Sequence, residues 1–133
     1  TFGGGGIYFR STKQKLNTTS STEAELVAVS DAMPSLIHVR EFLIHQGYDM
    51  GPANLYQDNQ STIKLIENGR SNSERTRHIN IRFFFVKDRL ASGEISVTYM
   101  PTDDMIADIL TKPLQGSKFR ELRARLLNWE EEM

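Results

Sequence analysis

The order in which helical and strand-like segments alternate along this chain limits its fold more than any other feature. Two short runs, 54–57 and 95–99, have the length and apolar character of strands. Two further runs, 7–9 and 16–19, are expected to form a hairpin. Apolar residues recur at helical spacing in five segments: 20–47, 61–67, 78–90, 103–110 and 119–127. This order predicts a mixed α/β layer architecture with antiparallel strands that lead into strand–helix crossovers.

Local signals mark the ends of the predicted elements. Ser20 is followed three residues later by Glu23, the pattern of a capping box at the start of a helix. Gly47 and Gly93 are expected to end the first and third helices. Pro34 lies inside the first helical segment, and it should kink that helix or divide it into two.

The composition is that of an ordinary globular domain. With 133 residues, 38% hydrophobic and 25% charged, we expect a single domain over residues 1–133. The absence of cysteine excludes disulfide and zinc–thiolate chemistry. No apolar run approaches the roughly 20 residues that span a bilayer, so we expect no membrane segment. The lack of cysteine fits a reducing compartment, and we expect an intracellular protein. A glycine run at 3–6 is not followed by the Gly-Lys-Ser/Thr of a phosphate-binding loop.

Positive charge gathers in two stretches, although the net charge is only −1. Residues 64–89 hold seven Lys or Arg against three acidic residues, and residues 118–125 hold four against one. Such stretches are found on solvated helix faces, and they are also found on surfaces that bind phosphate groups. Charge alone leaves both interpretations open.

Three acidic residues occupy positions where carboxylates often serve chemistry. Glu25 lies near the start of the first helix, Asp58 directly follows a strand, and Asp108 lies in a late helical segment. Ligands of α/β sheets usually bind at the carboxyl ends of strands, and carboxylate oxygens suit hard cations such as Mg²⁺. The chain has 17 acidic residues, most of them expected on the surface, so the pattern alone is weak.

Four sequence blocks resemble the ribonuclease H domains of copia-type retrotransposon polyproteins. The resemblance covers nearly the whole chain with the same order and spacing. The blocks are Ser20-Ser21-Thr22-Glu23-Ala24-Glu25-Leu26, Asp58-Asn59-Gln60-Ser61, Arg77-His78-Ile79 with Ile81-Arg82, and Ala107-Asp108-Ile109-Leu110-Thr111-Lys112-Pro113-Leu114. It implies a ribonuclease H-like three-layer α/β fold with a mixed sheet. It also implies hydrolysis of the RNA strand of an RNA/DNA hybrid with two Mg²⁺ ions, or with Mn²⁺.

The resemblance also implies roles for individual residues. Glu25, Asp58 and Asp108 would be the catalytic, metal-binding carboxylates, and Glu23 would be the helix-cap partner. Asp104 lies one helical turn before Asp108. It is either a further residue of the same site or a surface residue. Contacts to the backbone, phosphates or 2′-hydroxyls of the hybrid are implied for seven residues: Ser21, Thr22, Gln60, Arg75, Arg77, His78 and Arg82. For His78, a role at the start of the helix is an equal alternative.

The sequence departs from the family pattern at several positions. The family's first strand carries an Asp that bridges both metals, but no acidic residue precedes Glu23 here. We therefore expect the first strand to be missing from this chain or replaced. The reverse transcriptase domain, another chain, a separate segment or a domain swap could supply it, and the sequence does not choose between them. Asn80 and Phe84 replace an Asp and a His of the basic block. No histidine follows His78, so a histidine close before Asp108 is absent.

Two functions from different classes therefore remain. The first is the hybrid-specific endoribonuclease of a retroelement reverse transcriptase, located in a cytoplasmic particle or in the nucleus. The second is a domesticated, non-catalytic module with the same fold, acting as a structural or interaction subunit of a larger assembly that contains RNA, with an organelle as a further location. A missing first strand favours the second function, whereas the three retained carboxylates favour the first.

Overall fold

The computed structural model describes residues 1–18, 20–68 and 77–129, and for Arg77 and His78 it describes the backbone alone. The chain divides into two compact units, one formed by Thr1–Gln14 with Pro101–Met133 and the other by Lys15–Met100. Each unit is described by itself. The elements are α1 (Ser21–His45), β1 (Ala53–Gln57), α2 (Gln60–Asn68), α3 (Arg77–Ala91), β2 (Ile95–Tyr99), η1 (Thr102–Asp104), η2 (Ile106–Leu110) and α4 (Gly116–Leu127).

Helix α1 begins and ends where the sequence predicts. The Ser20 hydroxyl accepts a hydrogen bond from the Glu23 backbone N–H at 3.2 Å and thereby caps the first turn. Gln46 closes the helix, and Gly47 follows with φ of +92°, a conformation that favours glycine. The helix passes through Pro34 without dividing, so the predicted division is wrong. Buried residues on both sides, including Met33 and Leu43, secure it against the lost hydrogen bond.

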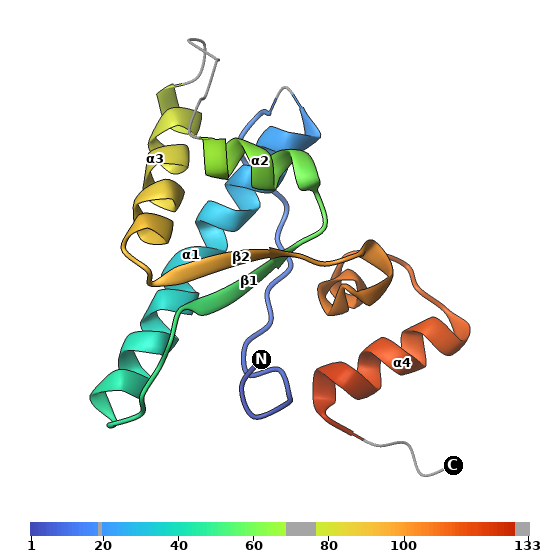
Figure 1. The fold of residues 1–133 in the computed structure, drawn as a ribbon. Coiled ribbons are helices and arrows are strands. Elements are labelled where there is room, and N and C mark those ends of the chain that lie inside the picture. The colour runs from blue at the N-terminus through green and yellow to red at the C-terminus, as the bar shows by residue number, and fades with distance from the viewer. Residues whose placement is uncertain (19, 69–76, 130–133) are drawn as a thin grey trace. The chain divides into compact units, whose positions relative to one another are not determined.

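The Lys15–Met100 unit contains a two-stranded parallel sheet. β1 and β2 pair in register from Ala53 opposite Ile95 to Gln57 opposite Tyr99. Parallel strands need a long crossover, and α2 and α3 lie between the two strands in the chain (Figure 1). Side chains of β1 alternate between the helices and solvent, with Gln57 buried at the last inward position.

The helices of this unit bury one apolar core against the sheet. Helix α1 packs against α2 and α3, and all three contact the strands (Figure 1). The residues of this core are Leu26, Val27, Val29, Met33, Ile66, Ile79, Phe83, Val86 and Ile95. Burial of these side chains holds the starts of α1 and α2 beside the sheet, where the candidate site lies.

The other unit is built around α4. Helix α4 packs against η2, and Leu122 is its buried side chain. The chain's first residues run past the end of α4, where the Gly6 backbone N–H donates to the Leu126 carbonyl at 2.7 Å. A Cβ on Gly6 would clash with the exposed Phe9 ring, so that ring would have to move to accommodate a larger residue.

The predicted hairpin is wrong. Residues 7–9 and 16–18 form no strand, and residue 19 lies outside the described residues. Within residues 1–18, one isolated β-bridge joins Phe2 to Gly5. Ile7, Tyr8 and Phe9 are exposed. An isolated hairpin is marginal unless one apolar face is covered, and these exposed side chains lack such cover.

The predicted helix over 103–110 is also wrong. Its residues form two short 3₁₀ turns, η1 and η2, with Met105 extended between them. Pro101 and Pro113 bound this segment, and neither η1 nor η2 has a buried residue, so no packed face stabilises an α-helix there. The three-layer ribonuclease H-like arrangement and the single domain over 1–133 remain predictions. Over the described ranges, the structure contains no helix with the length and apolarity needed to cross a membrane.

The core of the Lys15–Met100 unit makes a test of stability possible at two adjacent phenylalanines. Phe83 is fully buried, whereas Phe84 is 63% exposed and touches Phe83 edge to face. We expect Phe83→Ala to lower the free energy of unfolding by about 3–5 kcal/mol. Phe84→Ala should lower it by less than about 1.5 kcal/mol, because it loses mainly the edge contact. Urea unfolding followed by circular dichroism measures both, and equal losses would contradict this core.

Candidate functional site

Glu25 lies in the second turn of α1 and is held by the end of β1. The side chain of Gln57, only 5% exposed, donates a hydrogen bond from Nε2 to Glu25 Oε2 at 3.3 Å. Glu25 Oε1 has no hydrogen-bond donor among the described residues, and the residue is half-buried. This contact connects two positions 32 residues apart and places the Glu25 carboxylate beside the carboxyl end of a parallel strand.

Asp58 lies in the turn that joins β1 to α2, and its neighbours fix that turn. The Gln57 side-chain oxygen accepts from the Asn59 backbone N–H at 2.9 Å. Asn59 Oδ1 in turn accepts from the Thr62 backbone N–H at 3.2 Å, which caps α2. Asp58 therefore lies between Gln57 and Asn59, whose side chains are both hydrogen-bonded, and it is half-buried.

The starts of α1 and α2 meet at this end of the sheet. Thr62, fully buried, donates from its hydroxyl to the Thr22 carbonyl at 3.4 Å. Ser21 and Gln60 are exposed at the first positions of their helices, and Thr22 is half-buried. The structure thus brings the first two sequence blocks together, with Glu25 in one and Asp58 in the other.

Asp108 belongs to the other unit, and it is described only there. It lies in η2, and its carboxylate forms an ion pair with Lys112 at 2.6 Å between Oδ2 and Nζ. The side chain is 16% exposed. Its backbone carbonyl accepts from the N–H groups of Thr111 and Lys112, which closes the short 3₁₀ turn. Asp104 is exposed in η1, as its surface interpretation predicts.

The donor atoms at the end of β1 fit a hard divalent cation. Mg²⁺ is usually bound by one or two carboxylates together with water and substrate phosphates, rather than by a cage of protein ligands. Glu25 and Asp58 supply two carboxylates in one unit. Within either unit, taken over its described residues, no three His, Asp or Glu side chains gather closely enough to hold a metal. The fit therefore rests on the oxygen chemistry of this pair.

The basic residues predicted to contact phosphate are described only in part. Arg82 forms an ion pair with Asp31 of α1 through Nη1 and Oδ1. It therefore links α3 to α1 in this structure. Arg75 lies outside the described residues, as do the side chains of Arg77 and His78.

Sequence reasoning missed Gln57 and gave Asn59 no role of its own. Gln57 is a positioning residue, since it joins Glu25 to the turn that carries Asp58. The alternation of β1 contained the signal, because a polar residue at an inward-facing position needs a buried hydrogen-bond partner. Asn59 precedes a helical segment and is a common helix cap.

The chain is similar to retrotransposon polyproteins. It is 33% identical over 119 residues to the retrovirus-related Pol polyprotein from transposon TNT 1-94 of Nicotiana tabacum, covering 90% of this chain and 9% of that polyprotein. It is 33% identical over 113 residues to the transposon Ty1-NL2 Gag-Pol polyprotein of Saccharomyces cerevisiae, covering 85% and 6%. The Ty1-JR2 Gag-Pol polyprotein of the same yeast is 35% identical over 115 residues, again covering 85% and 6%.

These similarities confirm the predicted kinship with retrotransposon polyproteins. The chain spans less than a tenth of the length of these curated relatives. No family model matches the chain, and no solved structure matches it.

The buried amide of Gln57 can be tested against an exposed glutamine three residues away. Gln57→Leu removes the hydrogen bonds to Glu25 and to the Asn59 N–H, and it leaves both without that partner. We expect the free energy of unfolding to fall by about 1–3 kcal/mol. Gln60→Leu makes the same chemical change on the surface and should alter it by less than about 0.5 kcal/mol. A Gln57→Leu variant as stable as the unmodified chain in urea would refute this role.

Proposed function

We propose that this chain is the ribonuclease H domain of a copia-type retrotransposon polyprotein and that it takes part in cleaving the RNA strand of an RNA/DNA hybrid. Its relatives are retrotransposon polyproteins. The proposal that this segment is the ribonuclease H domain rests on the four blocks and on the geometry of the first two. Substrate, metal and activity are part of the proposal.

The observation that carries the proposal is the contact between Gln57 and Glu25. It holds a carboxylate from α1 beside the strand end that is followed by Asp58. The two acidic blocks are separated in sequence, and the parallel sheet places the second at the edge where ligands of α/β folds bind. Two hard oxygen ligands at such an edge favour a site for divalent cations and phosphate groups.

The proposed roles follow from the positions of the side chains. Glu25 and Asp58 would hold divalent metal. Asp108 has a metal-binding role by the resemblance alone, and within its own unit its carboxylate is paired with Lys112. Bound Mg²⁺ or Mn²⁺ supplies activation of water and stabilisation of the leaving oxygen in phosphodiester hydrolysis. Gln57 orients Glu25. Ser21, Thr22 and Gln60 lie at the helix starts beside these carboxylates, where polar groups can contact the 2′-hydroxyls that distinguish RNA from DNA.

The first functional test replaces each carboxylate by its amide. In the polyprotein segment that contains these 133 residues, Glu25→Gln and Asp58→Asn should each lower Mg²⁺-dependent cleavage of a labelled RNA/DNA hybrid by at least about 100-fold. The matched control is Asp49→Asn, which neutralises an exposed carboxylate after α1 and should leave cleavage unchanged.

Two results would overturn this assignment. Absence of hybrid cleavage in the unmodified polyprotein segment would favour the domesticated, non-catalytic module. Equal loss of cleavage in Asp49→Asn and Glu25→Gln would show that the carboxylates act through overall charge rather than through a site.

The role of Arg82 in binding the hybrid can be tested through its ion pair. If Arg82 exchanges Asp31 for a phosphate, Asp31→Asn should tighten hybrid binding, because the competing carboxylate is lost. Arg82→Gln should weaken it and reduce the slope of log Kd against log salt by about one. The control is Asp88→Asn, which changes the net charge as Asp31→Asn does, at an exposed position of α3, the helix that carries Arg82. Equal tightening in both Asn variants, measured by fluorescence anisotropy, would contradict the exchange.

A further inference from the structure

Helix α4 carries an aromatic and cationic surface that the proposed catalytic site does not use. The guanidinium of Arg123 lies 5.9 Å from the centre of the Phe119 ring and 5.8 Å from the centre of the Trp129 ring. One guanidinium therefore makes cation–π contacts with two aromatic rings. The three residues, called here the α4 aromatic clamp, all belong to one unit.

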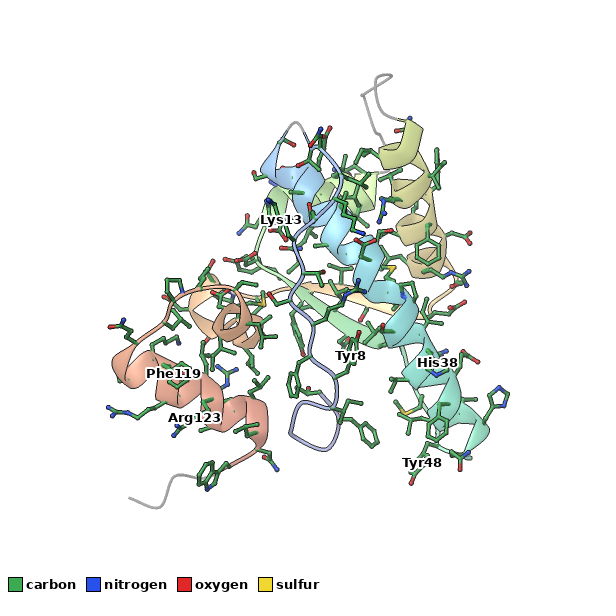
Figure 2. All side chains as sticks on the ribbon, turned by 180° about the vertical axis from the view of Figure 1, so that it is seen from behind. Tyr8, Lys13, His38, Tyr48, Phe119 and Arg123 are labelled. Atoms are coloured by element: carbon green, nitrogen blue, oxygen red, sulfur yellow. The ribbon has the colours of Figure 1, made fainter. Side chains whose placement is uncertain are left out.

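The sequence builds this clamp through helix geometry and a helix cap. Phe119 and Arg123 are four residues apart and lie on one face of α4 (Figure 2). Asn128 then adopts a left-handed conformation with φ of 52°, which ends the helix. The Trp129 backbone N–H donates to the Ala124 carbonyl at 2.9 Å. This turn places the indole ring beside Arg123.

The rings of the clamp are open to solvent. Phe119 is 38% exposed and Trp129 is 58% exposed. Contact with Arg123 favours this arrangement of both rings, which lowers the side-chain freedom that a flat, stacking ligand would remove on binding. Exposed aromatic rings of this kind are suited to binding rather than to core packing.

The charge of α4 favours an anionic partner. The helix has one acidic residue, Glu121, and four basic residues: Lys118, Arg120, Arg123 and Arg125. Lys118 and Arg125 lie near Glu121, at 3.3 Å and 3.8 Å. Arg120 is exposed and has no ion-pair partner among the described residues. Rings that can stack on bases, next to cations that can neutralise phosphates, are the two elements of sites for single-stranded nucleic acid.

We propose that the α4 aromatic clamp binds single-stranded nucleic acid by stacking its bases on Phe119 and Trp129, with Arg120 and Arg123 near the phosphates. The proposal does not use Glu25, Asp58 or Asp108, so it stands or fails separately from the proposed catalysis. Because every base has a flat π face, binding is expected to tolerate different sequences. Glu130, Glu131 and Glu132 follow Trp129 in the chain and would oppose phosphate binding.

The chain contains one tryptophan and four tyrosines, so fluorescence excited selectively at the tryptophan reports on the clamp. Titration of the full chain with a single-stranded oligothymidylate should quench Trp129 fluorescence, and added salt should reverse the quenching. This probe contains no RNA and is not a substrate of the proposed nuclease. Unchanged fluorescence and no binding by the labelled oligonucleotide would overturn the proposal and leave a protein partner as the alternative occupant.

Variants separate stacking from general charge. Phe119→Leu should weaken oligothymidylate binding about tenfold, whereas Phe42→Leu, which removes an exposed aromatic from α1, should leave it unchanged. With a labelled oligonucleotide, Trp129→Phe should retain binding and Trp129→Leu should lose it. Replacing Glu130, Glu131 and Glu132 by Gln should tighten binding. Equal affinity of Trp129→Leu and Trp129→Phe, with circular dichroism showing both folded, would overturn the stacking role.

Discussion

The buried amide of Gln57 is the interaction on which the candidate site depends. Because β1 pairs with β2 in a parallel sheet, Gln57, the last inward-facing residue of β1, lies in the interior. An unpaired polar group in the interior lowers stability, so the Gln57 amide requires partners. Gln57 meets that requirement with the Glu25 carboxylate on one side and the Asn59 N–H on the other. One side chain therefore fixes both the orientation of α1 at Glu25 and the turn that holds Asp58.

Elements with strong local signals could be predicted from the sequence. The Ser20 cap, Gly47 and apolar residues at helical spacing define α1, and the alternation of 95–99 defines β2. Elements that depend on distant partners could not. Residues 7–9 look like a strand, but strands form only where another segment pairs with them, and none does so within residues 1–18. The turns at 102–110 show how two flanking prolines override an apolar pattern.

The candidate site was predicted as a set of residue types rather than as a set of contacts. Asp58 directly follows a strand, where α/β folds bind ligands, whereas Glu25 was preferred to Glu23 because it matches the retrotransposon sequence block. Gln57 was missed because its importance comes from a partner 32 residues away. Arg82 was predicted to face phosphate, whereas in this structure it holds α3 to α1 through Asp31. Similarity to retrotransposon polyproteins agrees with the motifs and leaves the chemistry to experiment.

We propose that Glu25 and Asp58 form a divalent-cation site at the carboxyl end of β1. Paramagnetic broadening of backbone amide signals by Mn²⁺ tests it directly, because broadening falls steeply with distance from the ion and needs no catalytic turnover. Within the Lys15–Met100 unit, low concentrations of Mn²⁺ should broaden the signals of residues 22–26 and 57–60 first. Glu25→Gln should abolish this selectivity. Broadening centred on other acidic residues of that unit, or unchanged by Glu25→Gln, would contradict a cation site at Glu25 and Asp58.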